Sequence, residues 1–501
     1  MHEVRARAAR DGARGAWLAL ALGPFILLCT LNSAGYRYGA SDLAFYVPAA
    51  LTRLDPSLFP RDAFLIASQA RLTTVDEVLA GLARLTGAPL PALLAVLYGA
   101  TLALLAAALW SIGSRVYRSS YAALALLAAA TLRHAISRTG TNTLEAYFHP
   151  RQFAFALGTL AVAGFLAERR ALPAALLVGA GLLHPTTALW FAIWLGVATA
   201  VQDRGTRVPI AASGVLGIVA ASWLLFAGPL AGRLSPMDAE WLATLVTKDY
   251  LFPLDWPADV WLVNLAYAPV IVAIYWRRRA AGLLVRGETG LVTGCLSLLL
   301  LFGLALPFNA ARAAIVVQLQ IPRVFWMLDL LATIYVVWAL AEGRAGTARR
   351  ARVTAAVIAA ASLARGSYVM FVKFPDRPIA ELAIADDDWG RAMAWARGTP
   401  KDSGWMADPM HAVKYGTSLR VAGERDVFVE AVKDTAIGMY ERDVAIRTRD
   451  RLAELTDFEA MTPARARGLA ARHGLDYLVS EQPLDLPIAF QSGALRVYRV
   501  R

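Results

Sequence analysis

The chain is poor in charge and in cysteine, and each shortage excludes a class of protein. Only 18% of its residues are charged, against 57% that are hydrophobic, which excludes an ordinary soluble protein. Its two cysteines, Cys29 and Cys295, lie within apolar runs, so they form neither an extracellular disulfide framework nor a zinc cluster. The last quarter also lacks a glycine-rich phosphate loop, a metal-spaced His/Cys set and a Gly-x-Ser-x-Gly elbow.

What the sequence does contain is a series of long apolar blocks separated by short connectors. Blocks such as 90–112, 209–230 and 289–308 reach the roughly 20 residues that a helix needs to cross a hydrocarbon core of about 30 Å. The pattern predicts an α-helical multi-pass membrane protein. We expect about eleven spans, at 16–34, 90–112, 119–135, 152–167, 172–184, 186–201, 208–230, 259–275, 289–308, 323–342 and 353–372.

The positive charge is concentrated in alternate connectors. These are rich in arginine and poor in acids: Arg115, Arg118, Arg169, Arg170, Arg204, Arg207, Arg277, Arg278, Arg279, Arg344, Arg349, Arg350 and Arg352. By the positive-inside rule they face the cytoplasm, as does the N-terminus. Because the net charge of +12 is explained this way, membrane lipids rather than nucleic acid are the expected partners.

The apolar run 172–201 has cytoplasmic charge at both ends, which one helix cannot satisfy. The pair His184-Pro185 breaks it, since proline removes a backbone donor and tends to end a helix. Two short spans and a re-entrant pair both fit this pattern.

Two parts follow from the change in composition along the chain. Residues 1–374 form the transmembrane part, with a long first outer loop at about 35–89. Residues 375–501 have ordinary globular composition, with strand patterns at 475–479 and 494–500 and helical patterns at 389–397 and 464–473. We predict a small α/β domain here, on the periplasmic or extracellular side.

Polar residues gather in two outer loops. Asp42 follows the first span, four residues before Tyr46; it is a candidate base, or it simply caps a short helix. The second loop holds Glu145, His149 and Arg151 within seven residues, where Arg151 would bind an anion and Glu145 would act as base or metal ligand. An ordinary solvated loop that starts a helix at His-Pro explains the second set equally well.

Three more polar residues lie near the membrane face. His184 is explained as a helix-end residue as readily as a ligand. Arg312 and Arg323 flank the start of the tenth expected span, with Asp329 inside it. Ionisable groups at membrane depth tend to face a cavity or a partner, although a snorkelling arginine needs neither.

Several short motifs together resemble one enzyme superfamily. They are Ser41-Asp42-x-x-Phe45-Tyr46, His149-Pro150-Arg151 at the start of a span, His184-Pro185, and Asp388-Trp389 through Trp395 to Thr399-Pro400. With the layout, they resemble bacterial multi-pass members of the GT-C superfamily of polyprenyl-phosphate-dependent membrane glycosyltransferases. The chain departs from the oligosaccharyltransferases of that superfamily in lacking a clear Asp-x-Asp and a Trp-Trp-Asp signature, so a divalent metal stays open.

The resemblance implies a transfer of sugar from a polyprenyl-phosphate donor to an acceptor at the outer face of a bacterial inner membrane. It assigns Asp42 and Glu145 as catalytic. It assigns substrate binding to Tyr46, His149, Arg151, His184, Arg312 and Arg323, with Arg151 and Arg323 on the phosphate.

Two other classes of function stay open. A transporter or lipid flippase would also place polar residues at membrane depth, but it predicts internal symmetry, and no repeat is visible along the chain. A catalytically inactive relative that serves as a scaffold would keep the same fold.

Overall fold

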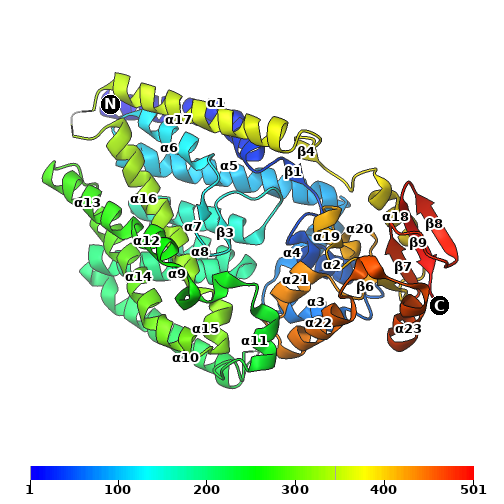
Figure 1. The fold of residues 1–501 in the computed structure, drawn as a ribbon. Helices are drawn as coiled ribbons and strands as arrows, with labels where there is room; N and C mark the ends of the chain where they lie inside the picture. The colour runs from blue at the N-terminus through cyan, green and yellow to red at the C-terminus, as the bar shows by residue number, and fades with distance from the viewer. Residues whose placement is uncertain (1, 229, 345) are drawn as a thin grey trace.

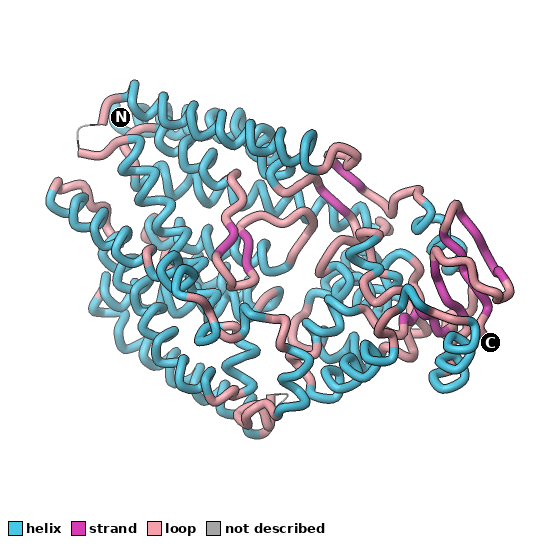
Figure 2. The backbone as a smooth tube through the Cα atoms, viewed as in Figure 1, coloured by secondary structure: helices cyan, strands magenta, loops and turns pink. Residues whose placement is uncertain are grey.

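Figure 1 shows the chain as a computed structural model that describes residues 2–228, 230–344 and 346–501, with side chains from residue 15 on. The N-terminus lies among the long helices at one end, and the C-terminus lies beside a small sheet at the opposite end. Figure 2 shows that most strand is at this C-terminal end and that helix makes up most of the rest. The expected mostly helical architecture is confirmed.

Among the residues described, seven segments are long and apolar enough to cross a membrane, so the chain is a multi-pass membrane protein. Their elements are α1 (His2–Asn32), α5 (Leu90–Val116), η1 with α10 (Arg204–Thr206, Arg207–Phe226), α12 with α13 (Ala258–Leu265, Tyr267–Ala280), α14 (Glu288–Ala310), α15 to α16 (Ala314–Leu319, η4 Ile321–Arg323, Val324–Ala341) and α17 with η5 (Ala348–Tyr368, Val369–Lys373). No residue of α10 is buried against the protein, as suits a helix that faces lipid.

Four other expected spans fall on helices that are shorter or less apolar than these seven. They are α6 (Ser120–Ala130), α7 (Pro150–Leu166), α8 (Ala171–Leu183) and α9 (Pro185–Gln202). The count of eleven spans therefore stays a prediction. The break at His184-Pro185 is confirmed: α8 ends at Leu183, and Pro185 is the first residue of α9, a position where its missing N–H is not needed.

The first outer loop is folded rather than extended. It contains β1 (Tyr36–Arg37), α2 (Leu43–Leu54), α3 (Ala63–Ala70) and α4 (Val75–Thr86). Strand β1 pairs in parallel with β4 (Ala380–Glu381), so the start of the loop is joined to the start of the tail. Between the membrane helices lie the hairpin β2 and β3 (Ala135–Ile136, Thr141–Asn142), α11 (Ala239–Leu245), η2 (Asp249–Leu251) and η3 (Pro253–Asp255).

The tail contains a five-stranded mixed sheet in the order β6-β5-β7-β9-β8. Its strands are β5 (Gly404–Met406), β6 (Asp426–Val427), β7 (Tyr477–Ser480), β8 (Ile488–Ser492) and β9 (Leu495–Arg499). Its helices are α18 (Asp388–Ala396), α19 (His411–Lys414), α20 (Leu419–Ala422), α21 (Ala431–Ile437), α22 (Arg442–Glu454), η6 (Phe458–Ala460) and α23 (Pro463–His473). Strands β7 and β9 and helices α18 and α23 confirm the four patterns expected in this region.

The tail has a core of its own and also shares one with the first outer loop. One apolar cluster joins Met406, Leu478 and Tyr498 to other tail residues only. A second cluster packs Ile437 and Val444 of α21 and α22 against Phe59 in the first loop. In Figure 1 these two helices, in orange, lie beside α2, α3 and α11. Helices α21 and α22 thus form a second contact between the first loop and the tail, besides the pairing of β1 with β4.

A buried charge cluster fixes this contact. The Arg420 guanidinium donates to Asp62 in the first loop at 2.7 Å and to both carboxylate oxygens of Asp434 in α21 at 2.6 and 3.0 Å. All three side chains are at most 2% exposed. Asp62 also accepts from Arg447 of α22. Because breaking a buried ion pair is strongly destabilising, this cluster stabilises the docked arrangement of loop and tail.

Substitution of Asp62 by alanine leaves Arg420 and Arg447 buried with fewer counter-charges. We expect the tail to lose about 3–5 kcal/mol of docking stability, which would appear as a lower thermal midpoint and faster proteolysis of residues 375–501 in detergent. Asp485→Ala, which removes an exposed carboxylate, is the control. Equal stability of both variants would contradict this role of the cluster.

Candidate functional site

A cavity of about 330 Å³ lies where the outer loops meet the tail. Its lining comes from the start of α2, the segment before α7, the starts of α9 and α16, and α21. We call it the Asp42 cavity, and seven of the eight residues expected from the sequence line it: Asp42, Tyr46, Glu145, His149, Arg151, His184 and Arg323. The structure therefore brings together loops that the sequence could only place on one side of the membrane.

Asp42 is at the N-cap position of α2 but does not cap it with its side chain. Its carboxylate instead accepts from His149 Nε2 at 2.9 Å and from Lys433 Nζ at 2.5 Å. Burial alone raises the pKa of Asp42, but the Lys433 ammonium and the His149 hydrogen bond outweigh burial and hold this pKa well below its ordinary value. Asp42 is therefore an ionised carboxylate at neutral pH.

The hydrogen bonds of His149 define its tautomer. Its Nδ1 accepts the backbone N–H of Arg151 at 3.0 Å, an interaction that starts α7, so the ring proton is on Nε2 and is donated to Asp42. Burial, together with the Arg151 charge, lowers the pKa of His149. The imidazole is thus neutral, has no free basic nitrogen, and holds Asp42 in position. His149 therefore has both of the features expected from the sequence: it starts α7, and it lines the cavity.

Glu145 and Arg151 form a buried ion pair. Arg151 Nη2 donates to Glu145 Oε1 at 3.0 Å, and its Nη1 donates to the Gly140 carbonyl at 3.2 Å. Both side chains are less than a tenth exposed. The pair adds no net charge to the cavity, because the Arg151 guanidinium neutralises the Glu145 carboxylate.

Arg323 is the exception to this pairing. It lies at the end of η4 and is 8% exposed. Its guanidinium has no hydrogen bond or ion pair with any residue that the structure describes, and its Nε is fully enclosed. Lys248 and the phenols of Tyr250 and Tyr440 line the same cavity. A buried cation without a counter-ion is unfavourable, so this part of the cavity is suited to an anion.

The remaining expected residues divide into two groups. Tyr46 packs edge-to-face on His149 with ring centroids 5.8 Å apart. His184 accepts the Thr187 N–H at 3.3 Å and so starts α9, while its ring is 6.4 Å from that of His149. Arg312 does not line the Asp42 cavity: it donates to Asp255 at 3.2 Å and lies over the Phe252 ring. Arg312 is thus separate from the other seven expected residues, and its role in substrate binding stays a prediction.

Sequence reasoning missed Lys433, Lys248, Tyr250 and Tyr440. Lys433 is an isolated lysine in a tail helix and carries no motif; only the docking of α21 brings it to Asp42, 391 positions away. Lys248 and Tyr250 lie in the connector after α11, where nothing in the local pattern marks them. No motif or pattern in the surrounding sequence marks these four residues as part of the site; only their side-chain chemistry is suggestive.

A divalent metal does not fit the residues as they are arranged. No group of three or more His, Cys, Asp or Glu side chains suited to a metal occurs in the part of the chain that the structure describes. Both Asp42 oxygens face N–H donors and Glu145 faces Arg151, whereas hard cations need free carboxylate oxygens.

No protein-family model matches the chain, and a search of curated proteins finds no match. Among solved structures, the cryo-EM structure of arabinofuranosyltransferase AftD from Mycobacteria aligns with 97% of this chain and 40% of that chain, at 17% identity and a TM-score of 0.49. The chain thus spans less than half the length of that protein. Similarity at this level assigns neither family nor function.

Substitution of Arg323 by methionine removes an unpaired buried charge while keeping a long apolar side chain. We expect the variant to be more stable than the wild type by about 1–3 kcal/mol, as is usual where a functional group is held at a cost in stability. Thermal unfolding in detergent measures this. Arg312→Met, which removes an arginine with a partner, is the matched control and should not be stabilised; a destabilised Arg323→Met protein would refute the unpaired state.

Proposed function

We propose that the protein is a membrane glycosyltransferase that moves a sugar from a polyprenyl-phosphate donor to an acceptor hydroxyl or amine. The observation that supports this most strongly is the Asp42 cavity itself. It holds an ionised carboxylate and, on another wall, a buried guanidinium without a counter-ion. A carboxylate that accepts a proton and a cation that receives a phosphate are the two groups such a transfer needs.

In the proposed reaction, Asp42 is the general base. The acceptor oxygen or nitrogen attacks the anomeric carbon and gives its proton to the Asp42 carboxylate. The bond from the anomeric carbon to the phosphate oxygen breaks, and its electron pair stays on the polyprenyl phosphate. Arg323, with Lys248 and the two phenols, stabilises the charge that grows on this leaving group. No step requires a metal.

The other residues of the cavity position these groups. His149 donates to Asp42 and fixes the direction of its free lone pairs. Glu145 neutralises Arg151 and orients it, so we assign Glu145 to positioning, whereas the resemblance implied a catalytic carboxylate. Tyr46 and His184 shape the wall around His149, with ring contacts of 5.8 and 6.4 Å.

We place the protein in a bacterial inner membrane with its N-terminus in the cytoplasm, because the arginine-rich connectors belong on that side. The Asp42 cavity and the tail would then face the periplasm or exterior. A lipid-linked donor reaches such a cavity through the bilayer, and its phosphate stops at the membrane face, where Arg323 lies at the start of α16.

Asp42→Asn keeps the shape of the side chain but cannot accept the acceptor's proton. We expect transfer to fall by roughly 10²–10⁴-fold. The assay uses purified protein in nanodiscs, radiolabelled polyprenyl-phosphate sugars and an envelope extract as acceptor. Asp249→Asn alters a half-exposed carboxylate paired with Arg138 and is the control. Full activity of Asp42→Asn would exclude Asp42 as base, and donor movement without a new glycosidic bond would instead indicate a flippase.

Lys433→Met removes the cation that does most to lower the pKa of Asp42, so this pKa rises. In the wild type, Asp42 stays ionised at pH values below the ordinary pKa of an aspartate. Its protonation therefore causes no loss of activity at mildly acidic pH. In the variant, the acidic limb of the kcat/KM profile should move to higher pH. Lys414→Met, which alters a lysine paired with Glu481, should leave the profile unchanged. An unshifted limb in Lys433→Met would contradict the assigned charge coupling.

A further inference from the structure

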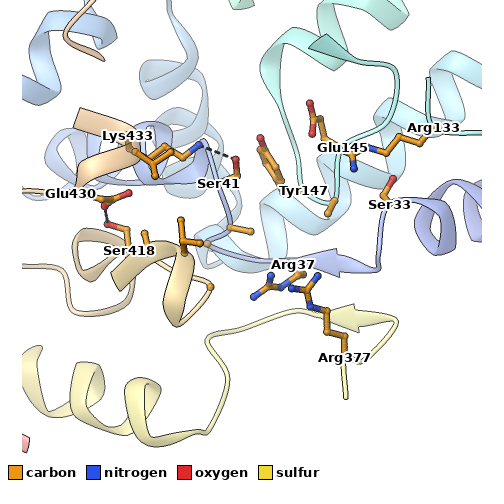
Figure 3. Close-up of a pocket in the computed structure, with 17 residues that line it drawn as sticks. Ser33, Arg37, Ser41, Arg133, Glu145, Tyr147, Arg377, Ser418, Glu430 and Lys433 are labelled. Carbon is orange, nitrogen blue, oxygen red and sulfur yellow. Dashed lines mark hydrogen bonds between the residues drawn. The ribbon is translucent and has the colours of Figure 1, made fainter. Parts of the chain in front are cut away.

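A second cavity of about 320 Å³ lies against the Asp42 cavity and shares part of its wall. Six residues line both: Ser41, Arg133, Glu145, Tyr147, Val432 and Lys433. The rest of the second cavity comes from the end of α1, β1, the start of the tail and the segment around α19. Figure 3 shows Lys433, Ser41 and Tyr147 on one side of it and Arg37 with Arg377 on another. We call it the Arg377 cavity.

Its polar lining carries an excess of positive charge. The guanidinium groups of Arg133 and Arg377 have no hydrogen bond or ion pair with any residue in the described ranges, although that of Arg377 stacks on Phe374. Arg37 and Arg377 line the same cavity, and only Arg37 of the two is paired with a carboxylate, Glu381, at 3.3 Å. Burial and the neighbouring Arg37 charge lower the pKa of Arg377. An oxyanion would relieve this repulsion.

The carboxyl groups of the wall do not offset these cations. Glu145 is paired with Arg151. Glu430 is fully buried and accepts from the Ser418 hydroxyl, and burial raises its pKa to about 7. A carboxyl with that pKa is about half protonated at neutral pH. The Arg377 cavity therefore keeps most of its positive charge.

Arg37 packs closely against the loop after α19. Gly416 in this loop has φ +81°, a left-handed conformation that favours glycine, and a Cβ placed on it would lie 2.2 Å from Arg37 Nη2. Since Nη2 is the end of a flexible side chain, this distance shows how closely the guanidinium approaches the loop.

We propose that the Arg377 cavity binds an anionic group of the acceptor, so that the acceptor is a hydroxyl or amine compound that also carries a phosphate or carboxylate. This inference rests on the proposed transfer. The anion would lie against Arg37, Arg133 and Arg377, and the nucleophile would extend past Ser41 to Asp42, the next residue. The donor phosphate would then lie in the Asp42 cavity and the acceptor anion in the Arg377 cavity, with Lys433 in the wall that the two cavities share.

The test measures binding without turnover, so it stands even if transfer is not observed. Detergent-solubilised full-length protein is titrated with glycerol 3-phosphate, glycerate and neutral glycerol as acceptor probes, and with geranyl phosphate as a short donor-like lipid phosphate. The two variants are Arg377→Met, which alters a residue that lines the Arg377 cavity but not the Asp42 cavity, and Arg323→Met, which alters a residue that lines the Asp42 cavity but not the Arg377 cavity. Arg377 is partly exposed, so its variant should fold normally.

We expect glycerol 3-phosphate or glycerate, but not glycerol, to bind the wild type in the millimolar range or tighter. Arg377→Met should weaken binding of the acceptor probes by at least about tenfold and leave binding of geranyl phosphate unchanged, and Arg323→Met should do the reverse. Absence of anion binding, or weakening of the acceptor probes by Arg323→Met alone, would overturn the proposal. Weakening of geranyl phosphate by Arg377→Met, with the acceptor probes unchanged, would overturn it too, because the Arg377 cavity would then be a donor site.

Discussion

The site depends on one buried interaction, the bridge that Arg420 makes between Asp62 of the first loop and Asp434 of the tail. Asp434 is the neighbour of Lys433 in α21, so the bridge that seats the tail also brings an ammonium to Asp42. Each member is unfavourable alone in a buried environment and acceptable only in the complete set. The membrane part supplies Asp42, His149 and Arg323 to the cavity lining, and the docked tail adds Lys433 and Tyr440.

Two ion pairs in the Asp42 cavity are complete: Asp42 is paired with Lys433, and Glu145 with Arg151. Arg323, Lys248 and Arg133 line the same cavity and have no carboxylate partner among the described residues. The surplus charge of Arg323 is left for a ligand, and burial strengthens its field because little water screens it. In the proposed function, the phosphate of the lipid donor is the counter-ion of Arg323, and we expect the cavity to bind it in preference to a neutral lipid.

Local physics explains what the sequence could predict. Apolar length identified the membrane helices, proline identified the break before α9, and alternation identified β7 and β9. Contacts between residues far apart in the chain could not be predicted from local sequence patterns. Arg312 and Arg323 have the same chemistry and similar positions, yet Arg312 is held by Asp255, 57 positions away, and Arg323 is left unpaired. Lys433 was missed for the same reason: its partner lies in another part of the chain, and helix α21 alone gives no indication of it.

Lys433 also resolves an apparent conflict in the proposed chemistry. A carboxylate with a strongly lowered pKa is a weak base, and Asp42 at rest is such a group. Lys433 lines both cavities, so in the proposed reaction an acceptor anion in the Arg377 cavity would compete with Asp42 for the Lys433 ammonium. Weaker pairing with Lys433 would raise the pKa of Asp42 and make the carboxylate a better base when an acceptor is bound.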